Sequence, residues 1–487
     1  MSEQKIKLPS SLALAVYKVL GIPHRLEKFG LVDTSFTEEE LASVKKLTFV
    51  NPASGGLRGI ELLPNLEVLN VCSDITSAYL PPKNRASIGF DDSIAIGKCK
   101  KLKQLKITNQ GNLEDLDVSQ LSDLECLEVS NNEMLTEING LGSLKKLWDI
   151  DLYGNNRLKY RNDKDREKNG IYSVIKNNPE LCCMRIDSLM FPDAIGYRQD
   201  GTYDGEMLKR IKQIGDVMWL ERFGKNKVIK LNTEQITVMH DKACRALKEY
   251  VPNGAASRDI AIGIERYLAE NVKYDHQSVE GKKNSHTSSQ KFKMGDQTIN
   301  LVQGPLHGAN SAFNAFLHGT CVCQGYTRAM QYMLRLKGIN SHDVACIAGK
   351  DTLGMADTKK RDMYATYRLP DDGYHSIVCI DDIDFLFCDP CWDASLYQIG
   401  DKSFKYALRT KSQISQDHTL SFDEANISND YSTVSRETLS DSIKRGEIFM
   451  QVSKKDLNQV AYNIKGVINK QNDRRNKEED KYDGRGE

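Results

Sequence analysis

The chain has 487 residues, which allows two to four domains at about 100–200 residues per domain. Its 67 lysines and arginines are balanced by 67 aspartates and glutamates, so the formal net charge is zero. This balance excludes a general electrostatic attraction to nucleic acid or to an anionic membrane surface.

The twelve cysteines are scattered and show no even framework of spacings. Reduced, buried thiols are therefore expected, which favours a reducing compartment. The first apolar run, residues 12–16, is too short for a secretory signal, and no run approaches the roughly 20 residues of a membrane span. We expect a protein without a signal peptide or a membrane span.

The N-terminal part begins with two predicted helices. Residues 9–21 show the helical spacing of apolar side chains. A second helix begins at Thr37, which forms a capping-box pattern with Glu40 three residues later. We predict a helical cap over residues 1–43.

A repeat of the form L-x-x-L-x-L follows, with copies that start at residues 44, 66, 102, 124, 147 and 181. Three of the intervals are 22 or 23 residues, within the range of about 20–29 residues for leucine-rich repeats. Asn132 and Asn155 stand where these repeats carry asparagine. The pattern resembles bacterial leucine-rich-repeat proteins and predicts a solenoid of short parallel strands over residues 44–190.

Alternate strand residues should line the concave face of this solenoid, a face that commonly binds proteins. On the central strands they include Glu128, Asp149 and Asp151. We expect this acidic group to favour a basic patch on a docked protein substrate. The same pattern is also expected if these side chains are only hydrated at the surface and bind no partner.

The rest of the chain is predicted to contain a junction, a larger α+β region and a C-terminal extension. The junction spans residues 191–232, with one helix near 205–214, and the α+β region spans 233–430, with helices over 233–250 and 257–275. Polar stretches at 276–300 and 349–373 are predicted to be loops, which can select substrate beside a site. Residues 431–468 are predicted to form helices, and 469–487 a charged disordered tail.

The segment from Gly319 to Tyr326 places a cysteine at the start of a predicted helix. Apolar side chains recur after it with helical spacing, and Gly338 supplies the stop expected beyond a helix C-terminus. The unpaired backbone N–H groups of a helix N-terminus favour a thiolate. Cys323 is therefore a candidate nucleophile, with Cys321 as its competitor.

A strand that contains His375 and a second strand that ends at Asp389 are predicted to form a hairpin. If its loop is centred on Asp382, His375 faces Asp389, with Cβ atoms roughly 4.5–5.5 Å apart. A carboxylate there fixes the tautomer and orientation of the imidazole. The acidic run 381–384 is then a hairpin turn rather than a calcium loop, and we predict no metal.

Three motifs stand in order in this region: Val322-Cys323-Gln324-Gly325-Tyr326, a histidine on a strand, and Asp389-Pro390-Cys391-Trp392-Asp393. They resemble the bacterial transglutaminase-like (papain-like thiol) superfamily, whose pattern is V-C-x-G-Y-A, G-H-x-W and D-P-T-W-D. The resemblance covers roughly residues 233–425. It implies a papain-like α+β fold in which Cys323 is the nucleophile, His375 the base and Asp389 its orienter.

Two positions depart from the family pattern. Ile377 stands where the family has an aromatic residue, and Cys391 stands where it has threonine. Papain-like thiol enzymes place a glutamine in the oxyanion hole, which makes Gln303 a candidate, although a plain loop glutamine fits its spacing as well.

The resemblance implies attack on a protein amide, without a cofactor. Hydrolysis of a peptide bond, deamidation of glutamine and crosslinking to an amine all stay open, as does a non-catalytic leucine-rich-repeat interaction protein. The combination of repeats and thiol domain also resembles secreted bacterial effectors. We therefore expect either a cytoplasmic protein or an effector that acts in a host cytosol.

Overall fold

The computed structural model describes residues 5–420, with the exception of residues 24, 26–31, 53, 74–86, 133, 159–164, 166–167, 199, 224–226, 276–287, 295–296, 304–307, 349–374 and 417. The chain divides into two units, residues 1–432 and 433–487, and every described residue lies in the first. The helices predicted over 431–468, the tail over 469–487 and the loop over 349–373 fall outside the described residues.

Two helices near the N-terminus form where they were predicted: α1 (Ser10–Leu20) and α2 (Glu38–Ser43). The Thr37 hydroxyl accepts a hydrogen bond from the Glu40 amide at 3.2 Å, and the Glu40 carboxylate accepts one from the Thr37 amide at 2.9 Å. This reciprocal capping box satisfies two amides at the start of α2. Two short strands, β1 (Ile6–Lys7) and β2 (Ser35–Phe36), pair antiparallel.

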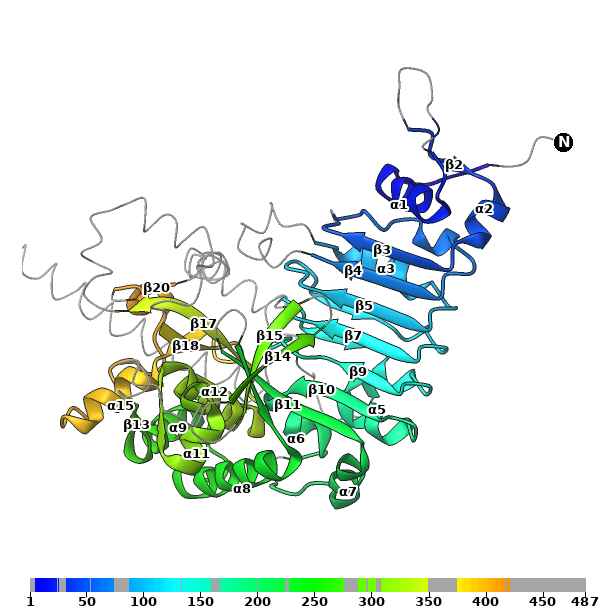
Figure 1. The fold of residues 1–487 in the computed structure, drawn as a ribbon. Helices are drawn as coiled ribbons and strands as arrows, with labels where there is room; N and C mark the ends of the chain where they lie inside the picture. The colour runs from blue at the N-terminus through cyan, green and yellow to red at the C-terminus, as the bar shows by residue number, and fades with distance from the viewer. Residues whose placement is uncertain are drawn as a thin grey trace, which may run out of the picture. The chain divides into compact units, whose positions relative to one another are not determined.

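Each of the six repeat segments forms a strand, and these strands are parallel neighbours in chain order (Figure 1). They are β3 (Lys46–Val50), β4 (Val68–Cys72), β5 (Gln104–Thr108), β7 (Cys126–Ser130), β9 (Asp149–Asp151) and β10 (Cys183–Asp187). Leu47 is in register with Leu69, and Leu69 with Leu105. These leucines are buried, so the repeated motif supplies a continuous hydrophobic core.

Buried asparagines beyond the strand ends join successive repeats. Asn132 accepts a hydrogen bond from the Gln110 amide at 2.9 Å and donates to the Ile107 carbonyl at 3.1 Å. Asn155 repeats this pattern with the Asn132 amide at 3.0 Å and the Val129 carbonyl at 2.6 Å. The asparagine position of the motif is thus explained by backbone groups that would otherwise be buried without partners.

The two long intervals between repeats hold helices, α3 (Phe90–Gly97) and α5 (Ile171–Asn177). The buried Asp92 carboxylate of α3 accepts hydrogen bonds from the amides of Gly55 at 2.7 Å and Leu57 at 2.8 Å. A separate parallel pair is formed by β6 (Asp115–Asp117) and β8 (Glu137–Asn139). Single 3₁₀ turns occur at Ile60–Leu62, Leu141–Ser143 and Ser188–Met190.

The predicted junction over residues 191–232 is wrong as a separate element, because it continues the repeat sheet. After α6 (Phe191–Ala194) and α7 (Gly205–Gln213), β11 (Asp216–Phe223) pairs in parallel with β10, and β12 (Lys227–Leu231) pairs antiparallel with β11. The polar stretch 276–300 is also not simply a loop, since β14 (Ser288–Met294) and β15 (Gln297–Gln303) extend the same sheet. Among the described residues this sheet has ten strands, in the order β14-β15-β12-β11-β10-β9-β7-β5-β4-β3.

A group of helices and a second sheet follow. The helices are α8 (Thr233–Tyr250), α9 (Ser257–Asn271), α11 (Ala312–His318), α12 (Cys323–Leu336), α15 (Pro390–Gln398) and α16 (Lys411–Ile414), with a 3₁₀ turn at Gly308–Asn310. The antiparallel sheet has the described order β19 (Leu386–Cys388), β18 (His375–Ile380), β17 (Ser341–Ala348) and β20 (His418–Leu420). The described residues therefore form a mixed α+β structure, and none of their helices is both long and apolar enough to cross a bilayer.

A buried ion pair connects the last repeat strand to α12. The guanidinium of Arg328 lies 2.9 Å from the carboxylate of Asp187, and both side chains are almost completely buried. A second acid, Glu221 of β11, is also buried and accepts hydrogen bonds from the Ser188 hydroxyl at 2.9 Å and the Ala312 amide at 3.1 Å. The charge of Glu221 acts on Arg328 as well, so one cation balances two buried carboxylates.

Candidate active site

Cys323 is the first residue of α12 and is half-buried. The preceding Cys321 lies in β16 (Thr320–Cys321), which pairs with β13 (Lys273–Tyr274). A Cβ at Gly325 would lie 2.9 Å from the Cys321 sulfur and 2.7 Å from the Ala309 carbonyl oxygen. The glycine of the motif is therefore required by close packing around the cysteine turn.

The tyrosine of the same motif fixes this turn to a neighbouring helix. The buried Tyr326 hydroxyl donates a hydrogen bond to the Val272 carbonyl, just beyond α9, at 2.8 Å. With Gly325, this contact sets where the first turn of α12 lies, and so where the Cys323 thiol lies.

The hairpin that carries His375 has a different register from the predicted one. In the structure, Cys379 faces Phe387 and Val378 faces Cys388. The expected pairing of His375 with Asp389 would have placed Cys379 opposite Phe385, so the observed register differs from the predicted one by two residues. The loop is longer than predicted because Asp384 and Phe385 both adopt positive φ, so Phe385 belongs to the turn. A shift of two residues keeps every side chain on its predicted face.

His375 and Asp389 nevertheless meet across the hairpin. His375 Nε2 lies 2.6 Å from Asp389 Oδ2, and Cys323 is close enough to contribute to the raised pKa of His375. Nε2 is engaged by Asp389, which leaves Nδ1 as the ring nitrogen for the thiol. The structure thus brings together the cysteine, histidine and aspartate that the sequence singled out.

The D-P-x-W-D motif has a structural reason at each polar position. Asp389 is the N-cap of α15, where its Oδ1 accepts hydrogen bonds from the amides of Cys391 at 3.1 Å and Trp392 at 3.0 Å. Pro390 occupies the first helical position, which needs no amide donor. Asp393 accepts from the Tyr406 amide at 2.9 Å. The motif therefore caps one helix and holds the segment that follows it.

Electrostatics in this cluster favour a charged pair. Burial disfavours the imidazolium, but the charge and hydrogen bond of Asp389, together with Cys323, raise the pKa of His375 to about 10. Burial alone would raise the pKa of Asp389, whereas His375 and His418 hold it well below its usual range. His375 is thus held protonated at neutral pH, where it can give a proton to a leaving group.

His418 is a member of this cluster that sequence reasoning missed. Its Nε2 lies 3.0 Å from the same Asp389 Oδ2 that His375 contacts. The sequence around His418 gives no local pattern that marks it as a site residue. It reaches Asp389 because β20 pairs with β17, and this pairing depends on the tertiary fold. Cys388 and Cys391 have C-x-x-C spacing around Asp389 but form no disulfide, and both thiols are buried.

The two candidate nucleophiles have different environments. Cys321 is completely buried, and burial raises the pKa of its thiol well above the ordinary value. Cys323 is accessible, begins a helix and contacts His375. These differences favour Cys323 as the reactive thiol.

Limiting iodoacetamide at neutral pH should therefore label Cys323 first, roughly tenfold or more faster than the exposed Cys182, because Cys323 combines partial access, a helix N-terminus and a protonated histidine partner. Peptide mass mapping at partial modification measures this order. A Cys323→Ser variant should lose the fast phase and keep the slow one. Preferential labelling of Cys321 would reverse the assignment.

The other predicted site residues have different outcomes. Gln303 is the last residue of β15, and its side chain is outside the part of the chain that the structure describes. Glu128 lies 3.4 Å from Lys106, and Arg185 bridges Asp149 at 2.8 Å and Asp151 at 3.0 Å. Asp151 is only 2% exposed. The expected acidic patch is therefore balanced within the repeat face, and Asp151 is an internal partner of Arg185 rather than a docking residue.

Two groups of described side chains bring metal-type donor atoms within 4.8 Å of one another: His342, Cys379 and Asp381, and His375, Asp389 and His418. Each contains a histidine and an aspartate with nitrogen and oxygen 2.6 Å apart. Tetrahedral ligands that bind one ion at about 2.1 Å lie more than 3 Å apart, so a shared proton fits this spacing better than a shared ion.

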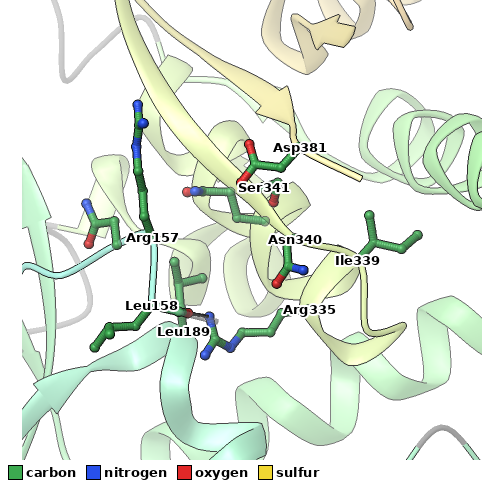
Figure 2. A pocket seen from close by; sticks show the side chains of 10 residues that line it. Arg157, Leu158, Leu189, Arg335, Ile339, Asn340, Ser341 and Asp381 are labelled. Carbon is green, nitrogen blue, oxygen red and sulfur yellow. Dashed lines mark hydrogen bonds between the residues drawn. The ribbon is translucent and has the colours of Figure 1, made fainter. Parts of the chain in front are cut away.

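A small polar hollow is lined by Gln331 and Arg335 of the C-terminal half of α12, and the thiol cluster does not line it (Figure 2). Arg335 crosses it, donating to the Asp193 carboxylate at 2.7 Å and to the Leu158 carbonyl at 3.0 Å. Asn340 and Asp381 line it as well. The hollow thus follows the contact between the last repeats and α12, and it is not part of the thiol site.

Comparisons with known proteins give no information about the thiol site. No family model matches the chain, and no curated protein matches it. Among solved structures, it is similar to the crystal structure of an internalin from Listeria monocytogenes, with 24% sequence identity and a TM-score of 0.24. The match covers 37% of this chain and 42% of the internalin, so the chain spans less than half of that protein.

Proposed function

We propose that the chain is a transglutaminase-like thiol enzyme that attacks protein amides, with the repeats as a protein-binding platform. The observation that supports it is the position of Cys323, at the start of α12, near His375, whose Nε2 lies 2.6 Å from the buried Asp389. A nucleophile, a base and an orienting carboxylate in hydrogen-bonded sequence are the parts that covalent amide chemistry requires. The three motifs that resemble the superfamily carry these residues.

In the proposed reaction, the Cys323 thiolate attacks the carbonyl carbon of the amide and forms a tetrahedral adduct. His375 gives its proton to the leaving nitrogen, the C–N bond breaks, and a thioester and a free amine or ammonia result. His375 then removes a proton from the second nucleophile, which attacks the thioester and releases the thiol. Asp389 keeps the imidazole oriented in both steps.

The identity of the second nucleophile defines the reaction. Water at a backbone amide gives a protease, water at a glutamine side chain gives a deamidase, and an amine gives a transglutaminase. We favour hydrolysis, with amine crosslinking as the alternative. The interaction of Cys323, His375 and Asp389 disfavours a purely structural, non-catalytic role for the thiol region, because a degenerate site would have no reason to retain all three in contact.

The experiment that tests this function is intact-mass analysis of candidate protein substrates incubated with the enzyme, with and without an added primary amine. Chain cleavage identifies a protease, the small mass gain of amide-to-acid conversion identifies a deamidase, and an amine adduct identifies a transglutaminase. We expect one of these products with the wild-type protein and none with Cys323→Ala. Products that persist with Cys323→Ala would contradict the proposal.

A further inference from the structure

The Asp389 carboxylate is surrounded by hydrogen-bond donors. Its Oδ1 accepts from the two amides at the start of α15, and its Oδ2 is 2.6 Å from His375 Nε2 and 3.0 Å from His418 Nε2. The residue is 0% exposed, so it has no water to replace a lost donor. Both imidazoles therefore share one oxygen of the orienting carboxylate.

His418 is held in place independently of His375. It lies in β20, in register with Ala348 of β17, and its side chain is buried. Its ring centroid is 4.7 Å from that of Trp392 and 5.6 Å from that of Tyr406. Trp392 also contacts the His375 ring, at 5.8 Å. A rigid aromatic setting thus fixes where the His418 nitrogen meets Asp389.

We propose that His418 is a positioning residue that, through Asp389, sets both the orientation and the proton affinity of His375. This role rests on the proposed function. His418 would act on His375 through Asp389, without contact with the reacting atoms, and would be a fourth residue of the site beside Cys323, His375 and Asp389. His418 does not touch the thiol or the substrate amide in this proposal.

The chemical reason is competition for one oxygen. A hydrogen bond from His418 draws on the Oδ2 charge that would otherwise stabilise the His375 imidazolium. The same bond restrains rotation of the carboxylate, so Oδ2 stays directed at His375. His418 therefore moderates the proton affinity of His375 while keeping its ring aligned.

Other titratable groups also face this pair and are unchanged in the test below. They are Cys323 of α12, Cys346 of β17, Glu265 of α9, and Cys391 and Asp393 of α15. Because none of them is replaced, a change in the titration of His375 reports on His418 alone.

The test compares three replacements in the full-length protein. His418→Phe removes the donor and keeps a ring, His418→Gln keeps an N–H at a similar reach, and His418→Asn keeps an amide that is too short to reach Oδ2. The midpoint of the His375 ring titration is followed by NMR of protein labelled at its histidine carbons, and kcat and KM are measured on the substrate found by intact mass.

The His375 midpoint should start near the pKa of about 10 in the wild-type protein. It should rise by roughly half to one pH unit in His418→Phe and His418→Asn, because Asp389 then gives its full charge to His375. In the same two variants kcat should fall roughly 10-fold to 100-fold with KM unchanged. His418→Gln should restore both quantities. Asp389→Asn should move the midpoint in the opposite direction.

An unchanged midpoint in folded His418→Phe or His418→Asn would overturn the positioning role and leave His418 as a packing residue. An equal loss of kcat in the asparagine and glutamine variants would also overturn it. If His418→Phe does not fold, the asparagine and glutamine pair still decides the question. Failure of the proposed function appears differently, as the absence of any product from the wild-type protein.

Discussion

Replacing Cys323 or His375 with alanine should abolish amide turnover, with a loss of roughly 10⁴-fold to 10⁶-fold in kcat. The first change removes the nucleophile, and the second removes the group that moves the proton. Asp389→Asn should lose about 10⁴-fold, because an amide nitrogen would meet both histidine donors. It should keep the fold, since asparagine caps helices as well as aspartate does.

The matched control for these variants is Cys321→Ala. Cys321 is two residues from the nucleophile and completely buried, so this change should retain turnover within a few-fold of wild type even if stability falls. Quenched-flow or steady-state assays on the intact-mass substrate measure each rate. A fully active Cys323→Ala or an inactive but folded Cys321→Ala would contradict the assignment.

Arg328→Met should destabilise the protein by about 3–5 kcal/mol, measured as the free energy of unfolding in urea. The guanidinium is 1% exposed, lies 2.9 Å from the Asp187 carboxylate and also interacts with the charge of the buried Glu221. Methionine keeps the length of the side chain but leaves both acids without a counter-charge. The cost therefore comes from uncompensated buried charge rather than from lost packing.

Arg266→Met is the control for this prediction. Arg266 also lies on a helix and pairs with a glutamate, Glu270 at 2.9 Å, but its side chain is 62% exposed. An exposed pair of this kind contributes little to stability, so the variant should unfold close to wild type. Equal effects of the two replacements would show that burial of Arg328 does not determine its contribution.

Local signals predicted much of the fold. The spacing of leucines located every repeat strand, and the register of Leu47, Leu69 and Leu105 follows from burying one face. The capping box at Thr37 and helix α8 were also predicted, because caps and helical periodicity are properties of adjacent residues. The pairing of Cys323, His375 and Asp389 was predicted from motif order and the side-chain alternation of a hairpin.

Contacts between distant segments were not predictable in this way. The apolar residues of β11 gave no sign that they would join β10, and the polar sequence of β14 and β15 has little of the apolar alternation of a strand. The hairpin register was wrong by two residues because a positive φ at Phe385 cannot be read from an aromatic side chain. His418 and the Arg185 bridge were missed because their partners lie tens of residues away.

The unbroken sheet limits how this chain could have changed in evolution. β10 presents one edge to β9 and the other to β11, so it belongs to both the repeats and the helical region. Duplication of a whole repeat between β4 and β9 would lengthen the array without altering that shared strand. Loss of the β10 repeat would instead expose an unpaired edge on β11 and remove Asp187, the counter-ion of Arg328. Relatives should therefore vary in repeat number at the N-terminal side and keep the last repeat.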